Sequence, residues 1–278
     1  MVIESSGPLH PAPAFILCTA RSGSTLLRYL LDTHPELCAP PELHIGALCQ
    51  QLLWVHTYTV DEEQALEPEW AGASARRRTR RVVDEIMRDY CKRQGKLLWC
   101  EKSVSNLQRL HVLDDVYPDA PLIFLYRHCL DVVASGLEVE RSLPGRSGFE
   151  PWLGPQRKPF EALVEYWCDT TEQLLAHEGA NPRRSTRLRY EDLVTQPRRV
   201  LPRIFKLLEL DWDPQMVDRV FVTPHARGPG DDKILTTSRI ESGSVGRGFS
   251  LPWPTLVPEQ LARVQSLLAQ LHYAPLAS

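Results

Sequence analysis

Short apolar runs alternate with amphipathic segments along most of this chain. Four segments have the length of β-strands and end at polar or charged residues, at 15–18, 96–100, 121–126 and 186–190. The segment 121–126 is apolar throughout, as expected of a central parallel strand that helices cover on both faces. The alternation of such strands with helices predicts an α/β fold of three layers, in which a central parallel sheet is flanked by helices.

Apolar residues at helical spacing predict the helices. One helix follows the first strand, and others are expected over 74–94, 160–178 and 261–271 and from about 131 and 197. Residues 1–13 contain Pro and Ser and predict a loosely ordered lead. The Gly- and Pro-rich segments 142–158 and 223–254 are long for plain connectors, so a mobile loop and a lid over a site are expected there. We expect residues 1–278 to form a single domain.

Composition narrows the classes of function. The chain has 278 residues and a formal net charge of −3, which argues against general binding of nucleic acid. The basic run 76–81 therefore indicates a solvated helix face or an edge near an anionic substrate. Seven Cys without a C-x-x-C pair indicate reduced thiols, and their spacing with His matches no zinc pattern. With no secretory signal or membrane span in the sequence, a cytoplasmic protein is expected, and a homo-oligomer is left open.

The turn after the first strand carries the first candidate chemistry. It reads Arg21-Ser22-Gly23-Ser24-Thr25 and brings a guanidinium, three hydroxyls and backbone N–H groups to a helix N-terminus. Such a turn can hold a phosphate or a sulfate. The Walker A pattern requires Lys where Ser24 stands, so the lysine that serves the β- and γ-phosphates of a nucleoside triphosphate is missing.

A second candidate anion site follows the strand at 121–126. Arg127 comes directly after this strand, and Ser135 lies eight residues further along, in the next helix. Because the carboxyl ends of parallel strands meet at one edge of a sheet, both anion sites are expected to open into one crevice. Two anion sites without an obvious Mg²⁺-holding acid after a strand indicate a nucleotide with separated anionic groups.

Three stretches together resemble the P-loop sulfotransferases that use 3′-phosphoadenosine 5′-phosphosulfate (PAPS). They are Thr-Ala-Arg-Ser-Gly-Ser-Thr-Leu-Leu at 19–27, Tyr-Arg-His-Cys-Leu-Asp-Val-Val-Ala-Ser at 126–135 and Leu-Arg-Tyr-Glu-Asp-Leu-Val-Thr-Gln-Pro at 188–197. The motif style is similar to that of tyrosylprotein sulfotransferases and of bacterial sulfotransferases from small-molecule and polyketide pathways. The resemblance implies a P-loop-type fold and a PAPS-dependent enzyme that requires no metal and releases 3′,5′-ADP.

The resemblance also implies roles for single residues in binding the cofactor. The 5′-phosphosulfate is expected on the first loop, at Arg21, Ser22, Gly23, Ser24 and Thr25. The 3′-phosphate is expected on Arg127 and Ser135 and on the turn at 242–248, through Ser244 and Arg247. Tyr190 is expected to contact the adenine.

The catalytic base is expected outside the strand end that supplies it in related enzymes. Aryl and steroid sulfotransferases use a His in Lys-Thr-His, whereas the matching stretch here reads Glu101-Lys102-Ser103-Val104. Two prolines give the segment 38–45 a rigid, extended path that presents Glu42 and His44. Glu42 is the first choice for the base and His44 the second, with Lys102 and Arg21 neutralising charge on the transferred group.

These residues predict transfer of a sulfuryl group to a hydroxyl of a small-molecule or carrier-bound acceptor. Two alternatives stay open at this point. A P-loop kinase of a small metabolite would depend on ATP and Mg²⁺, which the missing Walker lysine disfavours. A non-catalytic nucleotide-binding protein would bind 3′,5′-ADP tightly without transferring any group.

Overall fold

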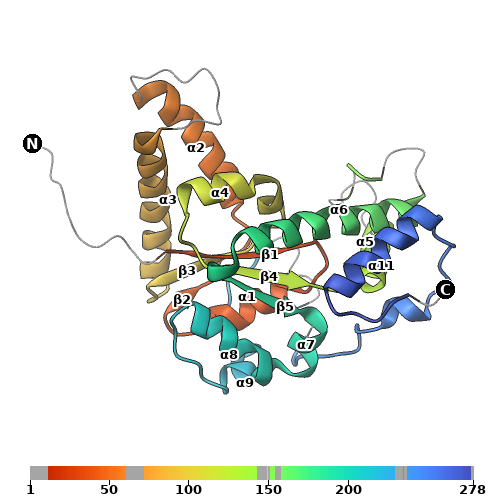
Figure 1. Cartoon of the computed structure of the whole chain (residues 1–278). Helices are drawn as coiled ribbons and strands as arrows, with labels where there is room; N and C mark the ends of the chain where they lie inside the picture. Colours follow the sequence, from red (N-terminus) through yellow and green to blue (C-terminus); the bar gives the residue numbers. More distant parts are fainter. Residues whose placement is uncertain are drawn as a thin grey trace, which may run out of the picture.

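The computed structural model describes residues 12–60, 72–142, 149, 151–153, 158–228, 234 and 237–276 (Figure 1). Within them a five-stranded sheet has the strand order β2-β3-β1-β4-β5. The strand pairings among these residues are parallel, and β1 pairs with β4 from Phe15 opposite Leu122 to Cys18 opposite Leu125. The strands are β1 (Ala14–Cys18), β2 (Leu37–Cys38), β3 (Leu98–Glu101), β4 (Leu122–Tyr126) and β5 (Ser185–Arg189). The predicted central parallel sheet is confirmed.

Side chains of the central strands alternate between two apolar layers, because successive residues of a strand point to opposite faces. Phe15, Leu17 and Phe124 pack on one face, and Ile16 and Ile123 on the other. The first face is covered by α2 (Ile45–Val60), α3 (Ala73–Arg93), α4 (Leu110–Val116), α5 (Cys129–Ser142), α6 (Pro159–Ala180) and α11 (Pro258–Gln270). The second is covered by α1 (Ser24–Asp32), α7 (Tyr190–Thr195), α8 (Pro197–Leu207) and α9 (Met216–Arg219).

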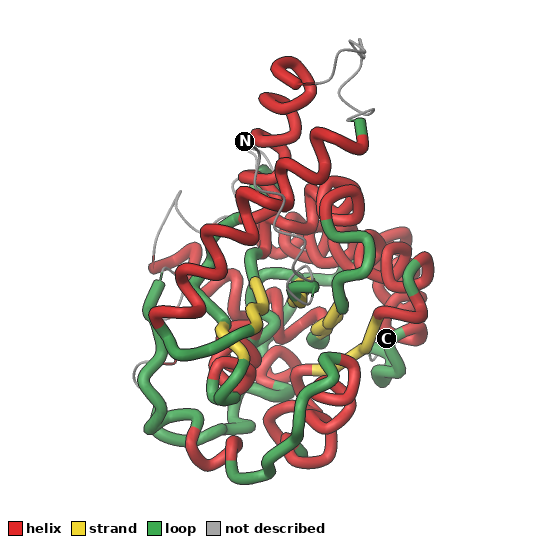
Figure 2. The backbone as a smooth tube through the Cα atoms, turned by 90° about the vertical axis from the view of Figure 1, so that its left-hand side faces the viewer, coloured by secondary structure: helices red, strands yellow, loops and turns green. Residues whose placement is uncertain are grey.

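The three predicted layers are therefore present, with helices above and below the sheet in Figure 1. The helices α2 and α3 pack side by side and project beyond the sheet, which both Figure 1 and the rotated view of Figure 2 show. Among the residues that the structure describes, no helix combines the length and the apolar character needed to cross a bilayer.

The sequence located β1, α3, β3, β4, α6 and β5 to within two residues of their ends. The last helix, α11, begins three residues before the expected 261, and the short helices α7 and α9 were not predicted. The short edge strand β2 was not predicted, because two residues are too few to produce a periodicity. The 3₁₀ helix η2 (Val104–Arg109) and α4 were missed as well. The helix α5 begins at Cys129, two residues before the expected Asp131.

Several predicted segments lie partly or wholly outside the described residues. They include most of the lead at 1–13, parts of the loop at 142–158 and part of the lid at 223–254. The described end of the last segment contains a turn and the 3₁₀ helix η4 (Arg247–Ser250).

Candidate active site

A cavity of about 490 Å³ opens where the carboxyl ends of β1, β3 and β4 meet. This is the edge at which open parallel sheets bind their ligands. The predicted residues that line the cavity are Arg21, Gly23, Ser24, Thr25, Glu42, Lys102, Arg127, Ser135, Tyr190, Ser244 and Arg247. Two predicted residues, Ser22 and His44, are not part of this lining. The fold thus brings together side chains that are up to 226 positions apart in the sequence, from Arg21 to Arg247.

The loop after β1 has a shape that its small residues permit. The backbone of Arg21 has φ 64° and that of Gly23 has φ 83°, both in the left-handed region. The hydroxyl of Ser22 is buried and donates to the carbonyl of Thr19 at 2.7 Å, so Ser22 shapes the loop from within. The N–H of Ala20 donates to the hydroxyl of Tyr166 at 2.6 Å, which ties the loop to α6.

The first turn of α1 faces the cavity through Gly23, Ser24 and Thr25. Among the described residues no side chain caps this helix. The N–H groups of an uncapped first turn and the positive end of the helix dipole favour a bound anion. The loop and this turn are therefore suited to a phosphate or sulfate group, and anion binding at this place stays a prediction.

Arg127 connects the two predicted anion sites. Its guanidinium donates to the carbonyls of Arg21 and Ser244, each at 2.9 Å, and lies over the ring of Tyr190 at 4.4 Å. Its Nε is buried and has no hydrogen-bond partner among the described residues. The hydroxyl of Tyr190 lies 2.6 Å from that of Ser244, so four segments distant in sequence converge here. Arg21 completes the wall, since its Nε donates to the hydroxyl of Ser135 at 3.1 Å.

Asp131 is a site residue that the sequence reasoning did not single out. Its carboxylate accepts the N–H groups of Gly246 at 2.8 Å and Gly248 at 2.7 Å, and it lines the cavity. This contact fixes the turn that carries Ser244 and Arg247. The signal was available, because Asp131 lies inside the stretch 126–135 that also contains Arg127 and Ser135.

Glu42 and Lys102 form an ion pair on the cavity wall. The Lys102 side chain is 4% exposed and that of Glu42 is 22% exposed, so the carboxylate remains accessible from the cavity while the ammonium is enclosed. The neighbouring His44 has φ 54°, and its Nδ1 lies 2.7 Å from the hydroxyl of Ser105. The imidazole is thus engaged outside the cavity lining.

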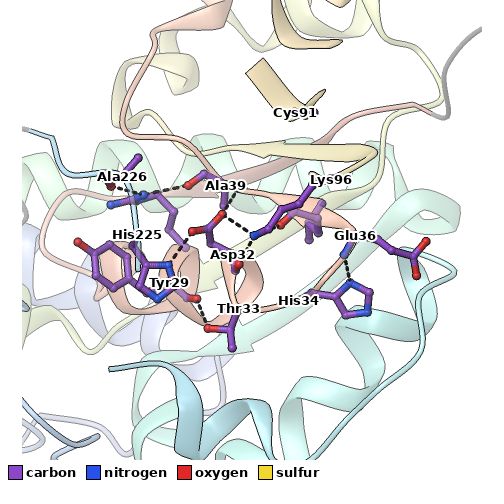
Figure 3. A network of polar contacts seen from close by, with 12 residues as sticks. Tyr29, Asp32, Thr33, His34, Glu36, Ala39, Cys91, Lys96, His225 and Ala226 are labelled. Carbon is purple, nitrogen blue, oxygen red and sulfur yellow. Dashed lines mark hydrogen bonds and ion pairs between the residues drawn. The ribbon is translucent and has the colours of Figure 1, made fainter. Parts of the chain in front are cut away.

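A buried network holds the chain just before Glu42 (Figure 3). The Asp32 carboxylate accepts the N–H of Ala39 at 2.9 Å and contacts Lys96 Nζ at 3.2 Å and His225 Nδ1 at 2.6 Å. Burial alone would raise the pKa of Asp32, but its hydrogen bond with His225, the Lys96 charge and the Ala39 N–H together lower that pKa. Arg28 donates to the carbonyls of Ala39 at 2.9 Å and Ala226 at 3.2 Å.

All seven Cys are buried, and none of them forms a disulfide. Burial raises the pKa of the Cys18 thiol to about 11.

In the basic run at 76–81, Arg76 pairs with Asp115 at 3.3 Å and Arg80 with Asp84 at 3.5 Å, and none of these side chains lines the cavity. The run is a helix face. Within the described residues no group of three or more His, Cys, Asp or Glu could hold a metal ion.

Comparison with known proteins gives this site a family. A family model described as "Sulfotransferase family" matches residues 13–214, which contain β1 to β5 and most of the cavity wall. The chain belongs to the sulfotransferase family. The resemblance inferred from the three sequence stretches is confirmed.

Two curated relatives of this sulfotransferase-family chain illustrate the range of the family. Nodulation protein NoeE of Sinorhizobium fredii is 28% identical over an alignment of 249 residues that covers 84% of this chain and 59% of NoeE. Protein-tyrosine sulfotransferase A of Caenorhabditis elegans is 23% identical over 281 residues, covering 95% of this chain and 68% of that protein. The chain therefore spans about three fifths of the length of NoeE.

Solved structures of sulfotransferases share the fold. The sulfotransferase domain of the Synechococcus PCC 7002 olefin synthase is 25% identical, with a TM-score of 0.68 over 96% of this chain and 98% of that domain. Mouse sulfotransferase SULT7A1, solved in complex with PAP, is 13% identical, with a TM-score of 0.50 over 93% of this chain and 83% of that chain. The P-loop-type sulfotransferase fold predicted from sequence is confirmed.

Proposed function

We propose that this protein transfers a sulfuryl group from PAPS to a hydroxyl of a small-molecule or carrier-bound acceptor, with Glu42 as the general base. One observation carries the proposal. An accessible carboxylate, paired with an enclosed lysine, lies on the wall of the cavity that the anion-binding loop also lines.

The residues of the cavity fit the proposed cofactor. A volume of about 490 Å³ lies in the range of cavities that hold nucleotide-sized ligands. The loop at 21–25 would hold the 5′-phosphosulfate, and Arg127, Ser135, Ser244 and Arg247 would hold the 3′-phosphate. The buried, unpartnered Nε of Arg127 supports an anionic occupant, because a buried donor without an acceptor is costly. When bound, PAPS supplies a sulfuryl group activated by its bond to a phosphate.

Glu42 is suited to accept the proton of an acceptor hydroxyl. Its carboxylate faces the cavity, and the Lys102 ammonium fixes the position of one carboxylate oxygen. A general base held in reach of the attacking hydroxyl contributes on the order of 10²–10⁴-fold to the rate. Lys102 and Arg21 also place positive charge beside the loop, where negative charge on the transferred and departing oxygens is stabilised.

The acceptor class rests on the relatives. The olefin synthase domain, of which 98% is covered, is part of an olefin synthase, and NoeE is a nodulation protein. Both favour a hydroxyl on a biosynthetic intermediate, free or carrier-bound. Assays of hydroxylated small molecules and carrier-bound hydroxyacyl chains with ³⁵S-labelled PAPS would identify the class.

Ligand-induced stabilisation tests the nucleotide. A ligand that binds only the native state stabilises it by about 2.7 kcal/mol at 100 times its dissociation constant. We expect 3′,5′-ADP to raise the melting temperature and Mg·ATP to leave it unchanged. A melting temperature that rises only with Mg·ATP would support the kinase alternative and overturn the proposal.

Two variants test the base. Glu42→Gln keeps the shape of the side chain but removes its basicity, so turnover should fall by about 10²–10⁴-fold while 3′,5′-ADP binds as before. His44→Ala is the matched variant on the same segment, and its turnover should stay within about threefold of wild type. The opposite pattern would assign the base to His44, and binding of 3′,5′-ADP without any transfer across the acceptor panel would leave a nucleotide-binding protein.

A further inference from the structure

Three side chains at and just beyond the end of β3 accept three backbone N–H groups of the segment that carries Glu42. The N–H of Leu43 donates to Glu101 Oε1 at 3.2 Å, and that of His44 to the Ser103 hydroxyl at 2.9 Å. The N–H of Gly46 donates to Asn106 Oδ1 at 3.0 Å. We call Glu101, Ser103 and Asn106 the β3 template. We infer that Glu101 is a positioning residue, which organises this template and thereby fixes Glu42 against Lys102.

The Glu101 carboxylate accepts from the side chains of both other members of the template. The Ser103 hydroxyl donates to Glu101 Oε1, and the Asn106 amide nitrogen donates to Glu101 Oε2. Each partner thus accepts from a backbone N–H and donates its own hydrogen to Glu101. A group at position 101 satisfies this pattern only if both of its oxygens accept, and an ionised carboxylate does so.

The burial of Glu101 shows how strongly the template depends on these bonds. Its side chain is 0% exposed, and burial raises the pKa of its carboxyl; the bonds from Ser103, Asn106 and Leu43 lower that pKa and offset only part of the rise. A buried carboxylate is tolerated only when donors satisfy its oxygens. Gly46 permits the approach of Asn106 to its N–H, since a Cβ there would lie 2.8 Å from Asn106 Oδ1.

The position of Glu101 in the chain links the template to the ion pair. Lys102 lines the cavity, whereas its neighbours Glu101 and Ser103 are buried and hold the segment of Glu42 through its backbone. Successive residues of an extended strand end point to opposite sides. One short stretch therefore supplies both the partner of the Glu42 carboxylate and the bonds that set the Glu42 backbone.

The inference rests on the proposed role of Glu42, and its test exchanges the carboxylate and the amide within the template. Glu101→Gln would turn an amide N–H₂ toward the N–H₂ of Asn106, so two donors would face each other. In the double variant Glu101→Gln/Asn106→Asp, the new amide donates to one Asp oxygen, and the other oxygen still accepts the N–H of Gly46. Net charge and hydrogen bonds are both restored.

We expect Glu101→Gln to lower kcat about 10- to 100-fold, since a misplacement of about 1 Å can cost 10²-fold in rate. The acceptor KM and the 3′,5′-ADP dissociation constant should stay within about twofold, and the double variant should recover kcat to within about threefold of wild type. Ser103→Ala provides a milder change if Glu101→Gln folds poorly, and should lower kcat by about 3- to 10-fold.

The outcomes separate this inference from the proposed function. Unchanged kcat in Glu101→Gln, or a loss of kcat that Asn106→Asp does not rescue, overturns the positioning role. If Glu42→Gln retains turnover while the Glu101/Asn106 exchange still rescues kcat, the base assignment fails and the template serves another residue of the segment. The melting temperature of each variant shows whether a loss of kcat comes from unfolding.

Discussion

Gly23 is the position where one added methyl group should disturb both the fold and the cofactor site. Its φ of 83° lies in the left-handed region, and an ideal Cβ would lie 2.2 Å from Tyr190 Cδ2 and 2.4 Å from Cε2. Tyr190 cannot move freely, because Arg127 lies over its ring and its hydroxyl contacts Ser244 at 2.6 Å. Gly23→Ala therefore combines backbone strain with a collision at a constrained ring.

The expected loss of stability is the sum of these two effects. A left-handed non-glycine residue costs about 1–2 kcal/mol, and overpacking a well-packed site costs about 1–3 kcal/mol. Gly23→Ala should thus lower the free energy of unfolding by about 2–5 kcal/mol. If Tyr190 turns away instead, the stability loss is smaller, but the ring leaves Ser244 and 3′,5′-ADP binds more weakly.

Two other glycines provide matched controls. Gly95 has φ 69° with no atom within 4 Å of an added Cβ, so Gly95→Ala reports the backbone strain alone. Gly179 lies within α6 without positive φ and also has open space around it. Gly179→Ala should stabilise the protein by about 0.5–1 kcal/mol, as expected for Gly→Ala in a helix. Urea denaturation of the three variants, with equilibrium dialysis of 3′,5′-ADP, separates the two effects.

One result would contradict an energetic role for the contact between position 23 and Tyr190. If Gly23→Ala unfolds within about 0.5 kcal/mol of Gly95→Ala and binds 3′,5′-ADP like wild type, the contact with Tyr190 has no energetic consequence.

Three further predictions concern Asp32 in the buried network before Glu42 and two residues of the cavity wall, Arg127 and Asp131. Asp32→Asn should cost about 3 kcal/mol at pH 7, because the enclosed Lys96 ammonium loses its carboxylate. The pKa of Asp32 is lower in the folded state than its value of about 3.9 in the unfolded chain, so the stability that Asp32 contributes is present above about pH 3.9 and is lost as pH falls through the folded-state pKa. Urea denaturation should therefore show the unfolding free energies of wild type and variant converging below about pH 4. Arg127→Lys should weaken 3′,5′-ADP binding at least about tenfold in equilibrium dialysis, because one ammonium cannot bridge two carbonyls and also cover the Tyr190 ring; an unchanged affinity would contradict the role of Arg127. Asp131→Asn should cost about 1–3 kcal/mol, because the new amide nitrogen faces a backbone N–H, and hydrogen exchange should report faster opening of the amides at 246 and 248 than in wild type.

The sequence predicted best those features that are encoded locally. The apolar segment 121–126 predicts a buried central strand, and the turn at 21–25 predicts a helix N-terminus with groups that can bind an anion. Both depend on neighbouring residues, so composition and periodicity suffice to find them. Their convergence on one cavity followed from the rule that parallel strands present their carboxyl ends at one edge.

The features that the sequence did not predict depend on contacts between distant segments. Asp131 is significant only because the turn at 246–248 returns to it, more than a hundred residues later. Glu101 has the appearance of an ordinary charged residue beside Lys102, and only the fold shows that it is fully buried and hydrogen-bonded. The hydrophobic periodicity of the sequence does not reveal such a contact, because the tertiary structure decides which distant residue becomes the hydrogen-bond partner.

The segment carrying Glu42 is held from both ends by such distant contacts. Before Glu42, the Ala39 N–H donates to Asp32 and the Ala39 carbonyl accepts from Arg28. Gly228 packs against Pro41, so closely that a Cβ added at Gly228 would lie 2.4 Å from the Pro41 ring. After Glu42, the β3 template receives the next N–H groups. A carboxylate whose backbone is fixed on both sides loses little further freedom when an acceptor hydroxyl arrives, so less of the binding energy is spent on ordering the proposed base. Weakening either end should therefore lower kcat before it weakens the binding of 3′,5′-ADP, because the loop proposed to bind the anion is held separately by Tyr166 and Arg127.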